Sequence, residues 1–149
     1  MWLDAILAYL HFAAILAVVW FLAKAWALLR AGAQAIDAPR LFHANIGYVI
    51  LLGVVLLTGA ARAVFGIKSW AFYAHNPAFH IKVTLFALLA LGSITPLRIF
   101  HGWRTARLHA AAYRIPLEEW RAARSWLMID MHLIALMPLA AVAMARGLV

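Results

Sequence analysis

The fold of this chain is decided by stretches such as AILAYLHFAAILAVVWFLA, which runs from Ala5 to Ala23. A helix needs about 20 mostly apolar residues to cross a bilayer, and its backbone must satisfy its own hydrogen bonds there. Three further stretches of this kind follow. We therefore predict transmembrane helices at about 5–24, 41–62, 79–100 and 126–145.

The composition agrees with a membrane protein. Of the 149 residues, 68% are hydrophobic and only 12% are charged, which excludes an ordinary soluble domain. Four spans with short connections leave no length for a separate soluble unit. We expect an all-α, four-transmembrane-helix bundle that forms a single integral membrane domain over residues 1–149. The chain contains no cysteine, which excludes disulfides, thiolate metal sites and cysteine nucleophiles.

The formal net charge of +8 is split by the long apolar runs, so it favours anionic lipid headgroups over nucleic acid as the partner. Cytoplasmic loops of membrane proteins carry the excess of Lys and Arg. One set of predicted helix ends holds Lys24, Arg30, Arg40, Arg98, Arg104, Arg107, Arg114, Arg121 and Arg124, and the other set holds Arg62, Lys68, Lys82 and Arg146. This distribution predicts that both termini lie outside the cytoplasm.

Several residues predict where helices begin and bend. Asp37 and Asn76 each precede a proline and are suited to cap the start of a helix. Pro96 and Pro138 lie inside spans three and four, and each removes a backbone donor, so we expect a kink at both.

The segment 101–124 predicts an additional helix on the inner leaflet. Arg104 and Arg107 share one helical face, and the segment also carries apolar side chains and a possible helix start at Pro116. Such a pattern is typical of an interfacial amphipathic helix. The aromatic rings on this side of the membrane are predicted to be headgroup anchors: Trp103, Tyr113, Trp120 and Trp126.

Ionisable residues inside the spans are the candidates for function, because a charge at mid-helix costs about 2.5–3.5 kcal/mol on insertion scales. Single histidines on separate helices suit haem b, whose iron needs only two axial ligands. A zinc site needs three or four converging ligands, and no His-Glu-x-x-His spacing is present.

The depths of these residues, at ~1.5 Å per residue, suggest which of them meet. We predict His11 and His80 as the axial ligands, with His132 as the substitute, and Arg62 and Lys82 as partners of the haem propionates. Other roles stay open. A histidine in a bundle also bonds a backbone carbonyl or a Ser/Thr of a neighbouring helix, and a Lys or Arg also reaches to headgroups. Asp130 is either protonated or paired with another helix.

Parts of the chain resemble known families. The opening WLDAILAYLHFAAIL, the stretch TGAARAVFGIKSWAFYAHNPAFHIKVTLFALLALGSITPL (residues 58–97) and the ending at 144–147 resemble a bacterial family of small four-helix membrane proteins of unknown function. His80-Ile-Lys82-Val is also similar to the His-x-Lys-Leu opening of a span in the HemJ-type protoporphyrinogen oxidases, which contain haem b. Tyr9-Leu-His11 takes the place of their first-helix histidine, but Ile129-Asp130-Met131-His132 stands where those oxidases have Asn-Glu-x-Pro.

These observations lead to one favoured function and one alternative. The favoured function is a b-type haem-binding redox or electron-transfer protein of the bacterial inner membrane, or a porphyrin oxidase, so enzymatic activity stays open. It would work with a membrane redox partner or as a homo-oligomer. The alternative is a non-enzymatic accessory or structural subunit of a larger membrane complex.

Overall fold

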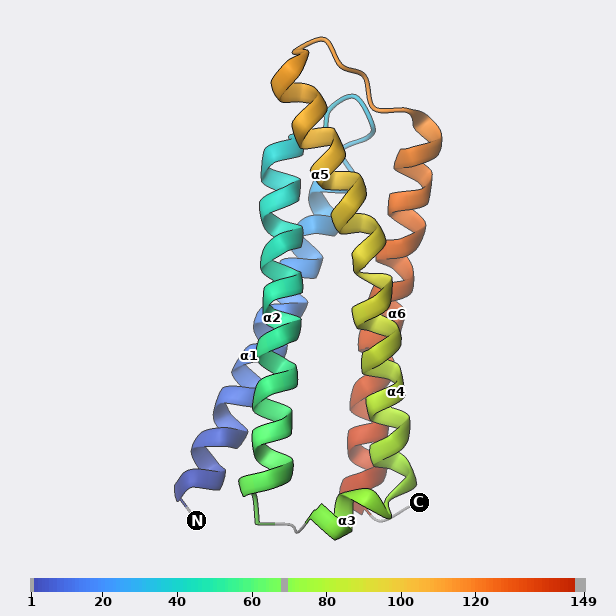
Figure 1. Ribbon diagram of the computed structural model, residues 1–149. Coiled ribbons are helices and arrows are strands. Elements are labelled where there is room, and N and C mark those ends of the chain that lie inside the picture. Colours follow the sequence, from blue (N-terminus) through green and yellow to red (C-terminus); the bar gives the residue numbers. More distant parts are fainter. Residues whose placement is uncertain (1, 68–69, 147–149) are drawn as a thin grey trace.

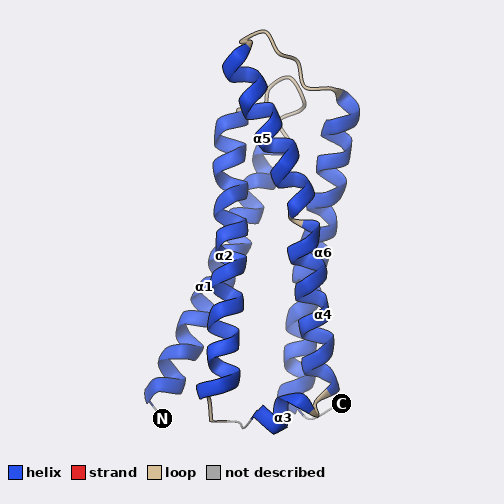
Figure 2. Cartoon of the chain, viewed as in Figure 1, coloured by secondary structure: helices blue, strands red, loops and turns tan. Residues whose placement is uncertain are grey.

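Helices make up almost all of the structure, a computed structural model that describes residues 2–67 and 70–146. The elements are α1 (Trp2–Leu29), α2 (Ala38–Phe65), α3 (Trp70–Ala74), α4 (Pro77–Gly92), α5 (Ile94–His109) and α6 (Leu117–Arg146). Figure 2 shows that loops join them and that the described ranges contain no strand. Four segments are long and apolar enough to cross a membrane: α1, α2, α4 together with α5, and α6. The all-α class and the four membrane helices are thereby confirmed.

The helices form two pairs that meet at one end of the bundle. α1 packs along α2, α4 packs along α6, and α5 crosses over to contact α2. Figure 1 shows the pairs close together at the upper end, near α5, and farther apart at the lower end, where α3 connects them. The start of α1 and the end of α6 lie at this lower end. α1 and α2 have 28 residues each, and such a helix is ~42 Å long, so it projects beyond a hydrocarbon core of ~30 Å.

The predicted helix starts are confirmed. The carboxylate of Asp37 accepts a hydrogen bond from the Arg40 backbone N–H at 3.1 Å, and Asn76 accepts one from Phe79 at 3.1 Å. Each cap satisfies an N–H group that the first helical turn leaves unpaired. Gly32 follows α1 with φ of +94°, a conformation that glycine adopts without the steric cost of a Cβ atom.

The two prolines act differently. The third span breaks at Ser93, between α4 and α5, one turn before Pro96. Proline has no N–H to donate to the Gly92 carbonyl, four residues earlier. At the same break the Ser93 hydroxyl donates to the Ala90 carbonyl at 2.7 Å. The kink predicted at Pro96 is confirmed. Pro138, in contrast, lies inside a helix that continues without interruption as α6.

The segment 101–124 is divided between the ends of two helices, and its position on the headgroups stays a prediction. α5 continues to His109 and α6 already begins at Leu117, so the two spans take up most of this segment. The end of α5 and the start of α6 pack against the bundle because their inward faces are apolar. Trp103 and Ala123 are buried there, with 1% and 0% of their surface exposed.

The upper end is held by polar contacts of aromatic residues. Trp103 Nε1 donates to Glu119 Oε2 at 2.7 Å, and Trp120 Nε1 donates to the Leu29 carbonyl at 3.0 Å. The anchor interpretation is therefore wrong for Trp103, whose ring joins α5 to α6. Nearby, partial desolvation and then the negative charge of Glu119 raise the pKa of Tyr113 above its ordinary value.

The outer surface of the bundle is strongly apolar. Large side chains that project from it include Leu16, Trp20, Leu57, Leu91 and Leu139. These residues belong to four different membrane helices. An apolar surface of this extent around a helical bundle is in contact with the lipid bilayer.

Candidate functional site

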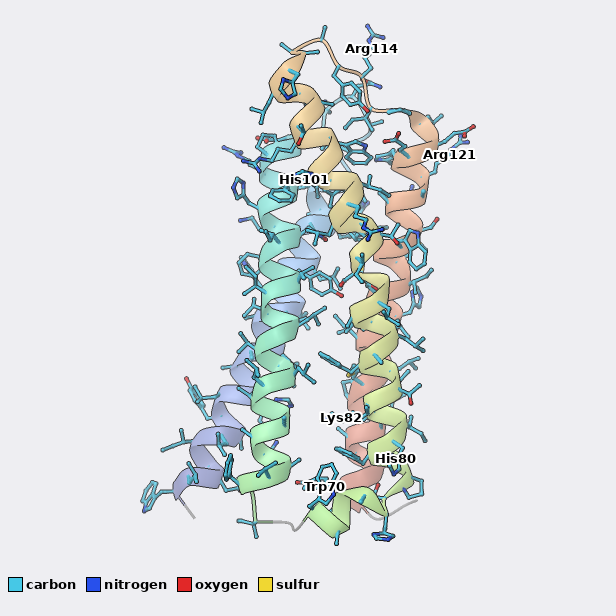
Figure 3. The ribbon with its side chains drawn as sticks, in the orientation of Figure 1. Trp70, His80, Lys82, His101, Arg114 and Arg121 are labelled. Carbon is cyan, nitrogen blue, oxygen red and sulfur yellow. The ribbon has the colours of Figure 1, made fainter. Side chains whose placement is uncertain are left out.

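Three of the five predicted site residues gather in the lower half of the bundle. They are His11 on α1, Arg62 on α2 and Lys82 on α4. The positive charges of Lys82 and Arg62 both act on the His11 ring, and the charge of Arg62 also acts on Lys82. In Figure 3, Lys82 lies at the edge of α4 that is nearer to α2. We call these three residues the basic cluster.

His11 is the buried member of the basic cluster, with 4% of its surface exposed. Its Nδ1 lies 2.9 Å from the Thr58 hydroxyl oxygen, and that hydroxyl itself donates to the Val54 carbonyl at 2.8 Å. The hydroxyl has one proton, which is used in the second bond, so Nδ1–H of His11 donates to Thr58. In this tautomer Nε2 carries the lone pair. The Cβ position of Gly59 is only 3.2 Å from His11 Cε1, so a glycine lets the ring approach α2.

The sequence analysis did not identify Thr58 as the partner of His11. The available signal was its spacing of four residues from Arg62, which places both on one face of α2. The general alternative, a histidine bonded to a Ser/Thr of a neighbouring helix, is the arrangement found for His11.

Neither Arg62 nor Lys82 forms an ion pair within residues 2–67 and 70–146, although the Asp4 carboxylate lies near the end of α2, 3.1 Å from the Cβ position of Gly66. The Arg62 guanidinium lies 5.9 Å from the Phe12 ring centroid, and its buried Nε has no hydrogen-bond partner in the described chain. The one ion pair among the described residues joins Arg40 to Asp37, far from this cluster. Two positive charges at membrane depth are costly unless an anion joins them. The basic cluster is therefore suited to bind an acidic group.

The other two predicted ligands are engaged elsewhere. His80 Nε2 lies 2.8 Å from the carbonyl of Ala74 at the end of α3, and His132 Nδ1 lies 2.6 Å from the Met128 carbonyl of its own helix. Both side chains are exposed. Figure 3 shows His80 low on α4, near α3. Because His80 and Lys82 differ by two positions, they point ~200° apart around the helix axis.

The structure therefore brings His11, Arg62 and Lys82 together and leaves His80 and His132 apart from them. The pairing of His11 with His80 as axial ligands stays a prediction. Within the described residues, no three or more His, Asp or Glu side chains are grouped to hold a metal ion.

Asp130 forms a second polar centre higher in the bundle. It is fully buried, and its Oδ2 accepts a hydrogen bond from the Tyr48 hydroxyl of α2 at 3.1 Å. The expectation that its partner comes from another helix is confirmed. His132, two positions later, is exposed, as the helical period requires.

An apolar groove lies between α2 and α5 near the upper end. It has a volume of about 410 Å³ and is lined by Phe42, Ile46, Leu97, Arg98 and His101. Figure 3 shows His101 at this end of the bundle, with Arg114 and Arg121 above it. The groove thus combines apolar walls with basic side chains.

Comparison with known proteins places the chain in a family. No curated protein and no solved structure matches the chain, so the resemblance to the HemJ-type oxidases stays a prediction. A family model described as "Predicted membrane protein (DUF2214)" matches residues 3–149. The chain belongs to this DUF2214 family of predicted membrane proteins.

Proposed function

We propose that the basic cluster binds an acidic, membrane-soluble cofactor, and that this cofactor is haem b. The observation that carries the proposal is the pair of cations, Arg62 and Lys82, which form no ion pair in the described chain and lie beside a buried histidine. Haem joins the two features in one molecule, because its propionates are acidic and its iron binds imidazole. The bound haem would supply one-electron chemistry for a redox or electron-transfer role.

The way His11 is held supports this assignment. A histidine that binds a metal usually donates its other ring N–H to a protein acceptor, which fixes the tautomer and the ring orientation. His11 donates Nδ1–H to Thr58, so Nε2 is the nitrogen that would face iron. Arg62 and Lys82 would hold the propionates. His80 and His132 remain the candidates for a second axial ligand.

The test is the absorption spectrum of protein purified from a haem-sufficient host. We expect a Soret band that is lost in His11→Ala and weakened in Arg62→Gln and Lys82→Gln. His75→Ala is the matched control, because this exposed histidine bonds the Ala71 carbonyl of the preceding α3 and should leave the band unchanged. Circular dichroism of each variant separates loss of haem from loss of fold. Folded wild-type protein that stays colourless after titration with haemin would overturn the proposal.

A second candidate function is an accessory subunit of a larger membrane complex, or a homo-oligomer. It is favoured by the lower end of the bundle, where the α1–α2 and α4–α6 pairs separate (Figure 1). A carboxylate from a partner would then neutralise Arg62 and Lys82. Native mass spectrometry distinguishes the two candidates, because colourless protein with a stoichiometric partner would support the accessory role.

We also infer that the protein lies in the bacterial cytoplasmic membrane with its upper end inside. The nine Lys and Arg residues of the larger set belong to the upper helix ends, whereas Arg62, Lys82 and Arg146 belong to the lower half. The groove near Arg98 and His101 would receive an anionic phospholipid, because its walls suit an acyl chain and its basic groups suit a phosphate.

The topology can be tested by labelling introduced cysteines, because the chain has no cysteine of its own that would also react. Two single-cysteine variants probe opposite ends: His75→Cys between α3 and α4, and Ala112→Cys between α5 and α6. We expect a membrane-impermeant maleimide to label His75→Cys in spheroplasts and to label Ala112→Cys only after lysis. The reverse pattern would show that the termini face the cytoplasm.

A further inference from the structure

The Asp130 carboxyl is buried without a compensating charge. None of its surface is exposed, and its Oδ1 has no hydrogen-bond partner in the part of the chain that the structure describes. Tyr48 of α2 is the ionisable residue that acts on it, through the hydrogen bond to Oδ2. Within the described residues, no charged side chain of α1, α4, α5 or α6 forms an ion pair with it. An isolated carboxylate in an apolar interior is very costly, and such a group takes up a proton or is hydrated.

The backbone of α4 closes one side of this carboxyl. The Cβ position of Gly92 lies 2.8 Å from Asp130 Oδ1 and 3.9 Å from the Trp126 ring. A side chain at position 92 would displace the carboxyl, so the glycine allows α4 and α6 to enclose it. On the outer side, Gly92 and Trp126 border an apolar groove of about 330 Å³. Oδ1 thus lies just behind the surface of the bundle and is shielded from lipid.

A second unsatisfied group lies on α2, one helical turn from Tyr48. Asn45 is fully buried, and neither its Oδ1 nor its Nδ2 has a hydrogen-bond partner among the described residues. Asn45 and Tyr48 are three positions apart, which places them on one face of α2. A buried polar group without a hydrogen-bond partner destabilises the fold. Buried water molecules commonly satisfy such groups, typically with about three hydrogen bonds each.

We propose that Asn45, Tyr48 and Asp130 form an internal proton-binding site that contains ordered water, and that Asp130 holds an exchangeable proton there. A neutral Asp130 removes the uncompensated charge and still accepts the Tyr48 hydrogen bond through its carbonyl oxygen Oδ2. The hydroxyl on Oδ1 then donates to a water molecule, which the Asn45 amide also binds. Exchange transfers this proton from Oδ1 to the water and returns one from it. The site does not depend on the basic cluster or on haem.

Infrared spectroscopy of the protein in lipid nanodiscs tests the protonation directly. We expect a carbonyl stretch of a protonated carboxylic acid at neutral pH, absent in Asp130→Asn. Asp37→Asn is the matched control, because this exposed carboxylate should leave the band unchanged. The amide of Asp130→Asn resembles the neutral acid in size and hydrogen bonding, so this variant should fold. If the band is missing from the wild type, or persists in Asp130→Asn, the proposal is overturned.

Two further measurements test the rest of the site. Tyr48→Phe should keep the band and shift it to higher frequency, because the carbonyl loses one hydrogen bond; an unshifted band would remove Tyr48 from the site. This variant also keeps the test valid if Asp130→Asn fails to fold. Transfer into D₂O should shift the band to lower frequency within minutes, since water reaches the acid proton. A band that never shifts would overturn the claim of exchange.

Discussion

Replacing Trp103 by alanine is expected to lower the free energy of unfolding by about 3–5 kcal/mol, the usual range for truncating a buried tryptophan. Trp103 is 1% exposed, and its ring centroid lies 5.3 Å from that of Phe100. Its Nε1 also donates to Glu119 of α6, so the truncation leaves a cavity and removes a link between two helices. Unfolding of the purified protein by titration with SDS in mixed micelles measures the loss.

A matched control shows whether the loss of stability comes from the burial of Trp103 or from removing any tryptophan. Trp20 on α1 is 68% exposed on the apolar surface, so Trp20→Ala should change stability by less than about 1 kcal/mol. Trp103→Phe keeps much of the ring and loses the hydrogen bond to Glu119, and its cost should fall between those of the two alanine variants. Equal costs for Trp103→Ala and Trp20→Ala would show that this ring does not join α5 to α6.

The sequence predicts the membrane helices well because lipid imposes a simple requirement. A long apolar run has to span the bilayer as a helix, and caps such as Asp37 and Asn76 are local features that need no knowledge of the neighbouring helices. The break near Pro96 is local in the same sense, since it follows from a missing backbone donor.

The depth of a side chain is also readable, because helices rise by a constant ~1.5 Å per residue. This is why Arg62 and Lys82, predicted to lie near the same outer level, come close enough to act electrostatically on each other and on His11. The rotation of each helix about its axis cannot be predicted from the sequence in this way. It depends on packing, and it decides that Lys82 joins His11 whereas His80 bonds the end of α3.

Partners across helices were the least predictable feature. Thr58 and Tyr48 are unremarkable residues of an apolar span, and their roles depend on which residue of another helix stands opposite. Trp103 was misassigned for a related reason. An aromatic ring near a predicted helix end fits the headgroup region and a helix contact equally well, and only the inward extension of α5 decides between them.

Replacing Gly47 by alanine is expected to cost about 1–3 kcal/mol, the usual range for overpacking a tight contact. The Cβ position of Gly47 would overlap the edge of the Phe21 ring at Cε1, so a methyl group there cannot fit unless the ring moves. Phe21 belongs to α1, and Gly47 therefore permits the close packing of α1 on α2. Titration with SDS measures the cost, as it does for the Trp103 variants.

Gly53 supplies the control for this prediction in the same helix. Nothing lies within 4 Å of its Cβ position, and alanine is a better helix former than glycine by roughly 0.5–1 kcal/mol. Gly53→Ala should therefore leave stability unchanged or raise it. The double variant Gly47→Ala, Phe21→Leu tests the contact itself, because a smaller side chain opposite residue 47 should recover part of the loss. If Gly47→Ala behaves like Gly53→Ala, α1 and α2 do not pack as closely as this contact requires.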